Sequence, residues 1–409
     1  MSFVDQAGIQ ALIEGLVQHM WPDEKGSVST PFPSMTYEEA MRDFGVDKPD
    51  TRFGIKLVNV SEVFDSTDVP FLRDTFRQPG GCVQAICVVN GAKHLKSKDL
   101  ESIKQVALVH FQQVCGNMNY TKKTQYAEVL LLEDGLFDCI LSCSVDFQQE
   151  VSVVVVKTDG TWKSPLGKML PESVKQSVHQ MTMAQPGDLL ILAAGQQDVV
   201  RPLLGKLRLY CAELLEEKGV ALRDPTAFHF LWVVDFPLFL PKKEEPGELE
   251  SAHHPFTAPH PEDADRLFSE PHKVRSQHFD LVLNGCEIGG GSVRIHNASV
   301  QKFVLEKVLK EDSSLLSHLL EALASGAPPH GGIALGLDRL LSIIVGASSI
   351  RDVIAFPKSF RGHDLMSGAP SFVSKEELRP YHIDVKWPAA DIPEESHSTT
   401  ILVAHNMIS

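Results

Sequence analysis

A pair of apolar runs separated by Asn284-Gly285 restricts the fold more than any other feature of the sequence. The runs cover residues 279–283 and 286–295, and both have the composition of strands. An Asn-Gly pair between two such runs predicts a two-residue hairpin, because both residues tolerate the positive φ angles that the turn requires. Further apolar runs predict strands at 231–236, 332–335 and 353–356. We therefore expect a mostly antiparallel sheet.

Two acidic residues, Asp280 and Glu287, lie close to the predicted turn. A two-residue turn pairs Val282 with Glu287, and alternation along the strands then places Asp280 and Glu287 on one face. Diagonal neighbours in an antiparallel pair lie about 7 to 8 Å apart at the backbone, close enough for two carboxylates to share a divalent ion. Such a pair suits Mg²⁺ bound together with phosphate oxygens. Acids on a solvated sheet face are the more common alternative.

Three consecutive glycines, Gly289 to Gly291, follow Glu287 on the same predicted strand. Glycine weakens a strand, so a run of three indicates that a ligand or another backbone comes close. Arg294 carries a planar fork that suits a carboxylate. Strict alternation from Glu287 turns Arg294 to the opposite face, whereas a bulge among the glycines restores it. A simple close crossing of the sheet is the alternative explanation of the glycines.

A short link, Gly336-Leu337-Asp338-Arg339, joins the strand at 332–335 to an apolar run at 340–345 that we expect to be a buried helix. Arg339 then falls in the first helical turn, where the positive end of the helix dipole disfavours a cation unless an anion lies nearby. The position indicates phosphate binding. A salt bridge from Arg339 to a neighbouring acid explains it equally well.

Two neighbouring histidines, His253 and His254, follow a polar loop at 241–251 that we expect to be mobile. They stand where a lid would meet a pocket. Adjacent residues on an extended segment point in opposite directions, so the pair is not expected to bind one metal ion. We expect one of them to face a ligand, with structural or exposed roles as the common alternative.

The chain shows two α+β regions, one inserted into the other. From about residue 51 to about residue 203, short β-rich runs at 82–90, 151–157 and 188–194 and a helix at 97–113 indicate an inserted domain. Asp5 is expected to cap a helix that stops at Trp21-Pro22, and Thr36 with Glu39 forms a capping box for a second helix. The first helix has an apolar face of Ile9, Leu12, Ile13, Leu16, Val17 and Met20. A long helix follows the insertion, with Leu203, Leu207, Tyr210, Cys211 and Leu214 on one face and Gly219 just after its end.

Composition excludes several classes of protein. Lys and Arg number 38 against 53 Asp and Glu in 409 residues, and the net charge of −15 argues against a protein that grips nucleic acid by bulk charge alone. The hydrophobic share of 43% and the charged share of 22% are typical of soluble globular chains. No run approaches the roughly 18 apolar residues of a membrane span, and we expect neither a membrane partner nor a transit peptide in this chain. The seven cysteines form no CxxC pair, which fits a reducing compartment and does not indicate zinc.

Several segments together resemble aspartyl-tRNA synthetase of the bacterial type, a class II synthetase, and most closely its animal mitochondrial form. The segments are Trp232-Val233-Val234-Asp235-Phe236-Pro237, His253-His254-Pro255-Phe256-Thr257, and residues 284–297, 331–339 and 350–358, with residues 45–50 and Arg52 in addition. The resemblance implies an α+β fold in which helices flank a class II antiparallel sheet. It also implies that residues 1–50 and 204–388 form the catalytic domain, that residues 51–203 form the bacterial-type insertion domain, and that residues 389–409 are a disordered tail.

The resemblance implies an aspartate–tRNA ligase, which activates L-aspartate with ATP and transfers it to the acceptor end of tRNA(Asp) in mitochondrial translation. Arg294, with His253 and His254, is then expected to hold aspartate, and Asp280 and Glu287 are expected to hold Mg²⁺. Residues expected to bind ATP are Glu287, Gly336, Leu337, Asp338 and Arg339. The catalytic residues would be Arg339, Glu287 and Arg294, which neutralise charge with Mg²⁺ while the aspartate carboxylate attacks the α-phosphate. A homodimer of the full-length protein and a place in the mitochondrial matrix are also implied.

Some parts of the family pattern are expected to be absent from this chain. They are the anticodon-reading OB-fold, the first class II motif and nearly all of the second, including the arginine that holds the α-phosphate. Removing one preorganised donor typically costs about 10² to 10³ in rate, so we expect the chain alone to be unstable or close to inactive. The segment 113–149 exceeds the family pattern between two copies of Phe-Gln-Gln, and we expect it to pack poorly.

Two other functions compete with the ligase. The first is a catalytically silent chain that acts as a binding or assembly partner of full-length subunits. The second is an ATP-dependent amide-forming enzyme on the same catalytic fold, which is disfavoured because the insertion domain belongs to the tRNA ligase. Aspartate-dependent ATP–pyrophosphate exchange separates the ligase from the silent partner.

Overall fold

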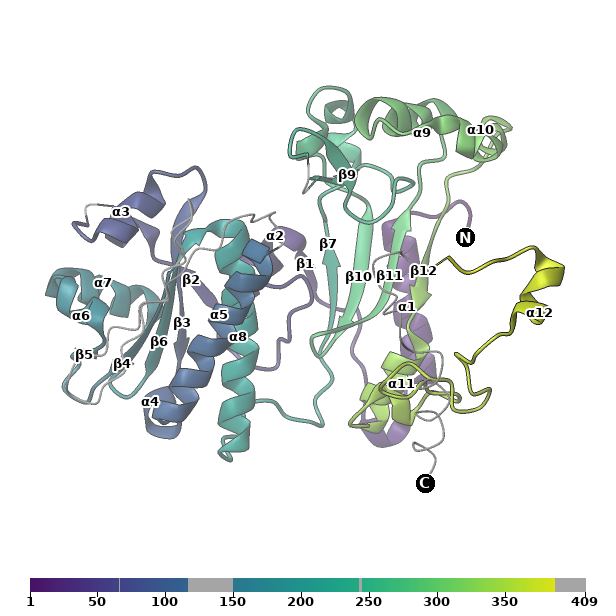
Figure 1. The fold of residues 1–409 in the computed structure, drawn as a ribbon. Helices are drawn as coiled ribbons and strands as arrows, with labels where there is room; N and C mark the ends of the chain where they lie inside the picture. Colours follow the sequence, from purple (N-terminus) through teal and green to yellow (C-terminus); the bar gives the residue numbers. More distant parts are fainter. Residues whose placement is uncertain (66, 117–149, 243–244, 387–409) are drawn as a thin grey trace. The chain divides into compact units, whose positions relative to one another are not determined.

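The computed structural model describes residues 1–65, 67–116, 150–242 and 245–386 (Figure 1). It divides into two compact units, residues 1–346 and residues 347–409. Two predictions concern residues outside the described ranges. Most of the segment 113–149 and the whole of the tail 389–409 fall there.

The first sheet joins strands that lie far apart in the sequence. In sheet order they are β1 (Ser34–Thr36), β7 (Phe230–Val234), β10 (His278–Leu283), β11 (Cys286–Val293) and β12 (Gly331–Leu335). β1 pairs with β7 in parallel, and the other neighbours in the sheet are antiparallel. The prediction of a mostly antiparallel sheet is confirmed.

The hairpin of β10 and β11 has the predicted turn. Leu283 pairs with Cys286 and Val282 with Glu287. Asn284-Gly285 connects them with φ angles of 52° and 82°. Two positive φ angles match the right-handed twist of the flanking strands, which explains the preference for Asn-Gly at this position.

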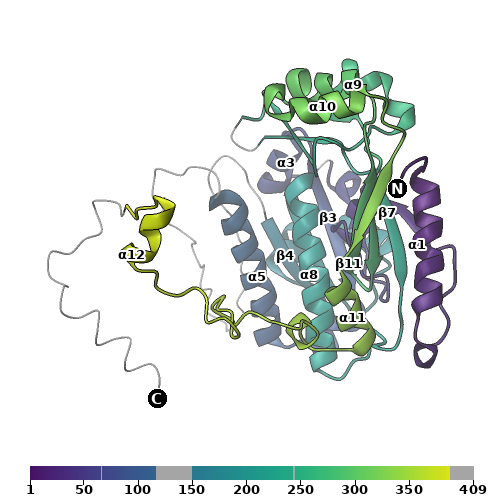
Figure 2. The same cartoon turned by 90° about the vertical axis from the view of Figure 1, so that its right-hand side faces the viewer.

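Helix α1 (Gln6–Met20) covers one face of this sheet together with α11 (Leu337–Val345), as Figures 1 and 2 show. The buried core between them contains Ile9, Ile13, Val17, Trp232, Phe279, Leu281, Leu283, Ile288, Leu340 and Ile344. On β10, alternation therefore turns Phe279, Leu281 and Leu283 toward these helices and the intervening residues toward the opposite face.

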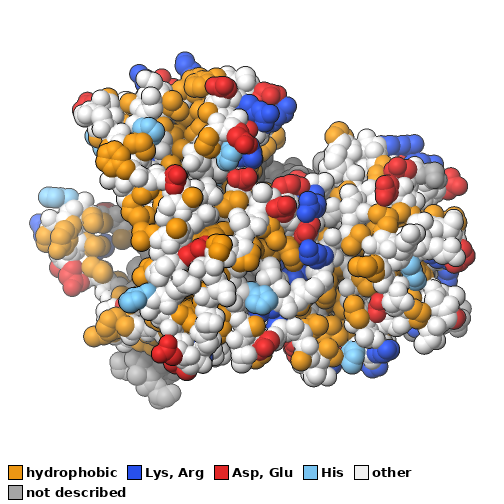
Figure 3. Space-filling model, turned by 180° about the vertical axis from the view of Figure 1, so that it is seen from behind, with side chains coloured by type: hydrophobic (Ala, Val, Ile, Leu, Met, Phe, Trp, Pro, Cys, Tyr) orange, Lys and Arg blue, Asp and Glu red, His pale blue; other side chains and the backbone are white. Residues whose placement is uncertain are grey.

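Helix α1 buries fewer of its apolar side chains than the sequence predicted. Asp5 caps α1 as expected, by accepting a hydrogen bond from the backbone N–H of Gly8 at 2.8 Å. Leu12 and Leu16 are 55% and 42% exposed, because they flank the line of Ile9, Ile13 and Val17 that faces the sheet. Figure 3 shows hydrophobic side chains on the surface of the molecule seen from behind.

Helix α11 also corrects a prediction, because it was expected to be buried. Only Leu340 and Ile344 are buried, and the exposed fractions of Leu337 and Val345 are 59% and 66%. The apolar side chains of α11 follow the 3.6-residue period of the helix, so a single line of them, that of Leu340 and Ile344, reaches the sheet.

A group of short strands and helices lies at one end of the first sheet (Figure 1). It contains β8 (Phe239–Pro241), β9 (Leu249–Ser251), α9 (Ala298–Phe303) and α10 (Ser317–Ala324). β8 and β9 pair in antiparallel fashion, so the ends of the loop predicted to be mobile at 241–251 are hydrogen-bonded to each other. Its mobility stays a prediction.

The second sheet is made of strands that all lie between Leu57 and Gln196. In sheet order they are β2 (Leu57–Asn59), β3 (Gly81–Val88), β6 (Leu189–Gln196), β4 (Glu150–Val156) and β5 (Trp162–Lys163). Two helices pack on one face, namely α5 (Ser97–Gly116) and α8 (Gln197–Glu217). Three others pack on the opposite face: α3 (Pro70–Phe76), α6 (Pro165–Met169) and α7 (Glu172–Thr182). The short α4 (Gly91–His94) follows β3. The domain boundaries at 50 and 203 stay a prediction.

Two helices connect the sheets. α2 (Tyr37–Phe44) begins with the predicted capping box, in which Thr36 and Glu39 bond each other's backbone N–H groups. α8 ends where predicted, and Gly219 follows it with a φ of 84°. The end of α2 touches α8 closely, since a Cβ atom on Gly205 would lie 2.7 Å from the backbone oxygen of Gly45.

The second unit is described from residue 347 to residue 386 and contains α12 (Lys375–Leu378) and short turns. The strand predicted at 353–356 is wrong. Ser349 and Asp352 form a capping box that starts a helical turn at Ile350–Asp352 instead, and Phe356 is 64% exposed. In the described part of the chain as a whole, no helix combines the length and the apolar composition that crossing a membrane requires.

Candidate active site

A bulge in β11 decides which side chains of the hairpin share a face. Val282 pairs with Glu287, but its neighbour Leu281 pairs with Gly289. Ile288 is therefore one extra residue on β11, and it shifts the alternation along that strand. A bulge among the glycines was the predicted device, and the structure places it directly before them.

The face that results is polar. Asp280 pairs with Gly290 and His278 pairs with Ser292, on the side of the sheet away from α1 and α11. Alternation from Gly290 also brings Arg294 to this face. The expectation that a bulge returns Arg294 to the side of Glu287 therefore agrees with the register.

The carboxylates of Asp280 and Glu287 converge over Gly290. A Cβ atom at position 290 would lie 2.9 Å from Asp280 Oδ1 and 3.0 Å from Glu287 Oε1. Glycine at this position therefore leaves the space into which both carboxylates turn. The Asp280 side chain is 3% exposed and that of Glu287 is 34% exposed. The prediction that the two acids share one face is confirmed.

The ammonium group of Lys48 lies between these carboxylates. Its Nζ is 3.4 Å from Asp280 Oδ2, 3.5 Å from Glu287 Oε2 and 2.7 Å from Asp47 Oδ2. Burial alone would raise the pKa of Asp280, but the hydrogen bond to His278 and the charges of His278 and Lys48 lower it overall. Burial alone would lower the pKa of Lys48, but the hydrogen bond to Asp47 and the three carboxylates raise it overall. These contacts favour the ionised form of Asp280, and the ammonium group shows that the pair of acids attracts a cation.

Arg208 on α8 fixes the loop that carries Lys48. Its fully buried guanidinium donates hydrogen bonds to the backbone oxygens of Asp50 at 2.7 Å, of Phe53 at 3.0 Å and of Ile55. It also lies 3.8 Å from the centre of the Phe53 ring. Burial lowers the pKa of Arg208 to about 10, which leaves it charged at neutral pH.

His253 reaches the carboxylates through a second imidazole. The rings of His253 and His278 stack with their centres 3.6 Å apart, and His278 Nε2 lies 3.0 Å from Asp280 Oδ1. Phe236 packs at nearly right angles against both imidazoles. His253 is therefore placed beside the polar face without touching Asp280 itself.

His254 contacts Arg294 instead. Arg294 Nη1 lies 2.8 Å from His254 Nδ1 and also contacts Nε2, and the backbone N–H of Phe256 donates to Nδ1 at 3.2 Å. Burial and the positive charge of Arg294 lower the pKa of His254 to about 4. The imidazole is therefore neutral at neutral pH. Among the described residues no carboxylate forms an ion pair with Arg294, so its charge is available to a ligand.

Arg339 lies in the first turn of α11, as predicted, with Gly336 at the N-cap. Its Nη1 donates to the backbone oxygen of Glu287 at 2.6 Å. Residues 336–339 are exposed. The alternative prediction, a salt bridge from Arg339 to an acid, is not met by any of the described residues.

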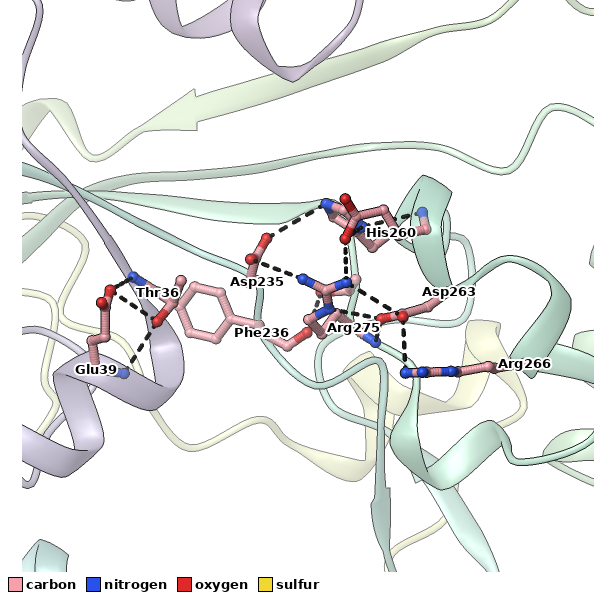
Figure 4. A network of polar contacts seen from close by, with 10 residues as sticks. Thr36, Glu39, Asp235, Phe236, His260, Asp263, Arg266 and Arg275 are labelled. Atoms are coloured by element: carbon pink, nitrogen blue, oxygen red, sulfur yellow. Dashed lines mark hydrogen bonds and ion pairs between the residues drawn. The ribbon is translucent and has the colours of Figure 1, made fainter.

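Arg275 ties the segment 260–263 to the end of β7 (Figure 4). Its guanidinium lies 2.7 Å from the buried Asp263, 2.8 Å from Glu262 and 3.5 Å from Asp235 at the end of β7. These acids raise the pKa of Arg275. Since Asp235 directly precedes Phe236, the network also fixes the ring that packs against the stacked imidazoles.

Three residues of this site, His278, Lys48 and Phe236, had no individual role among the predictions from the sequence. His278 could have been found from alternation, because it stands two residues before Asp280 on the same strand. Lys48 and Phe236 belong to segments that resemble the family. No local spacing connects them to the hairpin, and only the folded chain brings them there.

Asp280 and Glu287 suit a Mg²⁺ ion that binds together with a nucleotide. Across the described ranges, no group of three or more His, Cys, Asp or Glu side chains could hold a metal ion by itself. Mg²⁺ usually takes one or two carboxylates and completes its six ligands with waters and phosphate oxygens. The position of the Lys48 ammonium shows that the space between the two acids favours a cation.

The family follows from a comparison with known proteins. Residues 1–360 match the family model described as "tRNA synthetases class II (D, K and N)". The chain belongs to this family. The α+β class II fold that the motifs implied is thereby confirmed.

Curated relatives are similar over nearly the whole chain. The mitochondrial aspartate–tRNA ligases of Bos taurus and Homo sapiens are 54% and 53% identical, over 97% of this chain and 56% of their own length. The aspartate–tRNA(Asp/Asn) ligase of Opitutus terrae is 38% identical, over 95% of this chain and 59% of its own. The chain thus spans a little over half the length of these relatives. The solved aspartyl tRNA synthetase from Entamoeba histolytica is 23% identical over 39% of this chain and 27% of its own, with a TM-score of 0.26.

Proposed function

We propose that this chain carries the aspartate-activating site of an aspartate–tRNA ligase. The reaction joins L-aspartate to ATP as aspartyl-adenylate and passes the aspartyl group to the acceptor end of tRNA(Asp). The observation that carries the proposal is the polar face of the β10–β11 hairpin. There Arg294, which has no carboxylate partner among the described residues, shares one surface with the converging carboxylates of Asp280 and Glu287.

The charge of Arg294 supports aspartate among the amino acids that the family description names. A guanidinium binds a carboxylate through two parallel charge-assisted hydrogen bonds, which an asparagine amide cannot reproduce. A lysine side chain would bring a second positive charge to the same place, so repulsion excludes it. His254 supports this role because, as a neutral acceptor, it orients Arg294 without cancelling its charge. The names of the relatives agree with this choice.

ATP is proposed to bind on the carboxylate side of the same face. Asp280 and Glu287 would hold Mg²⁺, which when bound neutralises charge on the phosphates. Arg339 would hold the far phosphate, with residues 336–338 lining the approach. The nucleophile is the carboxylate of aspartate, already ionised at neutral pH, so no general base is required. The work of the protein is to position charges, which suits a site of fixed arginines and acids.

Three further parts of the proposal rest on the family and the relatives. The protein would act in the mitochondrial matrix, since the animal relatives are named mitochondrial enzymes. In its full-length form it would be a homodimer. The tRNA would be recognised at its acceptor end by this part of the protein.

Binding measurements test the site in the chain itself. We expect calorimetry to detect L-aspartate binding to the wild-type chain and no binding to Arg294→Ala, while ATP binding with Mg²⁺ persists. Arg339→Ala should show the reverse pattern. Arg266→Ala is the matched control, because Arg266 is exposed and, among the residues that the structure describes, forms an ion pair with Asp263 alone. Unaltered aspartate affinity in a folded Arg294→Ala chain would contradict the proposal.

Aspartate-dependent ATP–pyrophosphate exchange tests the chemical step. It should be measured in the 409-residue chain and in a version extended to the length of the relatives. We expect robust exchange in the extended version, abolished by Arg294→Ala, and little in the chain alone. A folded extended version that shows no exchange would favour the silent binding partner.

A further inference from the structure

The ammonium group of Lys48 stands at the point where the two proposed Mg²⁺ ligands converge. Its distances to Asp280 Oδ2 and Glu287 Oε2, 3.4 and 3.5 Å, exceed the roughly 2.7 to 3.2 Å of an N–H···O hydrogen bond. Its distance to Asp47 Oδ2 is 2.7 Å. Lys48 therefore holds Asp47 tightly and balances the charge of the other two acids without binding either closely.

The charge of this cluster is only partly balanced. Three carboxylates, those of Asp47, Asp280 and Glu287, surround one ammonium, which leaves two negative charges when the His278 imidazole beside Asp280 is neutral. Asp280 is almost fully buried, so water screens this excess poorly. Two positive charges would neutralise the cluster while Lys48 stays bonded to Asp47. The excess therefore matches one divalent cation.

The Lys48 ammonium can move away from Asp280 and Glu287, but the backbone that carries it is held in place. Its loop is fixed two residues later, where the Asp50 carboxylate is bound by Arg52 at 2.7 Å and the Asp50 backbone oxygen by Arg208 at 2.7 Å. Asp50 also packs against Gly285 of the hairpin turn, where a Cβ atom would lie 2.9 Å from Asp50 Cβ. Only the flexible four-carbon stem of Lys48 is free to move.

We propose that Lys48 is a tethered competitor for the divalent-cation site. In the chain without nucleotide its ammonium takes the place of the metal between Asp280 and Glu287, and a metal that arrives with phosphate oxygens displaces it from these two acids while it keeps its bond to Asp47. The inference rests on the proposed function, because it takes Asp280 and Glu287 as the Mg²⁺ ligands. Lys48 thereby lowers the affinity for free metal and reserves the site for metal that a nucleotide brings. The competing explanation is that Lys48 only pins its loop to the sheet.

Binding of Mn²⁺ alone distinguishes the two explanations. Free Mn²⁺ can be followed by electron paramagnetic resonance at neutral pH, without nucleotide. Lys48→Met should bind Mn²⁺ at least about tenfold more tightly than the wild type, because a positive charge next to both ligands is removed. Adding ATP should shrink this difference, since phosphate oxygens then displace the ammonium in the wild type. The matched control is Lys56→Met, whose ammonium pairs with Asp43 in the same segment, and it should match the wild type.

Two further variants keep the outcome decisive. Glu287→Gln added to Lys48→Met should remove the gained Mn²⁺ binding. Lys48→Gln keeps a hydrogen-bond donor for Asp47, and it should change the Mn²⁺ affinity in the same direction if the methionine variant is unstable. Equal or weaker Mn²⁺ binding by folded Lys48 variants overturns the inference, as does a gain that survives Glu287→Gln. Failure of the proposed function would be seen separately, as absent aspartate binding by the wild-type chain.

Discussion

Replacing Arg208 with methionine should destabilise the first unit by about 3 to 5 kcal/mol, the range for breaking a buried charged network. Arg208 is fully buried and donates hydrogen bonds to the backbone oxygens of Asp50, Phe53 and Ile55. A hydrogen bond from a charged donor is worth about 1.5 to 3 kcal/mol, so three of them amount to roughly 4.5 to 9 kcal/mol. Methionine fills much of the volume but donates nothing, and it also removes the cost of burying a guanidinium, which offsets part of the loss.

Urea unfolding and amide hydrogen exchange measure this effect together. Unfolding followed by tryptophan fluorescence and by circular dichroism gives the change in free energy, and exchange locates it. We expect the backbone amides of residues 50–55 to exchange faster in Arg208→Met, because this loop loses its clamp. Arg223→Met is the matched control. Arg223, which follows α8, forms a forked pair with Glu216 at the end of that helix, and because both side chains stay in partial contact with water its loss should cost clearly less than the loss of Arg208.

Two outcomes would contradict this role of Arg208. If Arg208→Met unfolds at the urea concentration of the wild type and its loop exchanges at the wild-type rate, the three carbonyls find other partners and the clamp contributes nothing. Destabilisation of equal size in Arg223→Met would also count against it, since the effect would then not depend on burial.

Three other predictions concern the hairpin face and the histidine beside it. Gly290→Ala should fold but bind Mn²⁺ about tenfold more weakly, because its Cβ pushes apart two flexible carboxylates. Gly291→Ala should fail to fold stably, because its Cβ would overlap the backbone oxygen of Gly332; a thermal unfolding midpoint equal to that of the wild type would contradict this. By NMR, His254 should stay neutral in the folded chain down to a pKa of about 4, and Arg294→Ala should raise that pKa by removing a neighbouring positive charge. The pKa of His254 in the folded chain lies below the ordinary 6.5, so the unfolded chain takes up the proton first as the pH falls. His254 therefore makes the free energy of unfolding decrease as the pH drops from about 6.5 toward 4. An unchanged His254 pKa in Arg294→Ala would count against the contact between the two side chains.

Local chemistry was enough to predict several elements of the first sheet. The Asn284-Gly285 turn, the cap at Asp5 and the Thr36–Glu39 box depend on residues a few positions apart, so the sequence alone determines them. The shared face of Asp280 and Glu287 follows from that turn by counting in twos. Local patterns also singled out Arg294 and Arg339, and the resemblance to known motifs then assigned them roles.

Tertiary structure decided what depends on neighbours from elsewhere in the chain. The extra residue at Ile288 could be anticipated as a bulge but not located, because its position depends on how β12 and β10 accept β11. The apolar run at 353–356 had the composition of a strand, yet no neighbouring strand pairs with it among the described residues and a helical cap forms before it. The exposed apolar residues of α1 and α11 could not be predicted either. Hydrophobic periodicity indicates which face of a helix turns toward the core, but not how much of that face the neighbouring elements cover.

Lys48 shows the limit most clearly. Its position between Asp280 and Glu287 arises because α8 returns from the second sheet and Arg208 clamps the loop against the hairpin turn. None of these contacts joins residues that are close in the sequence. The clamp binds backbone carbonyls and the loop packs against a glycine, and neither feature can be recognised from the sequence. The sequence by itself determined the turn, the caps and the acids that share a face, since these obey rules of a few residues' range. Only the folded chain could decide which cation meets those acids, because charge pairs across long loops are set by packing and not by spacing.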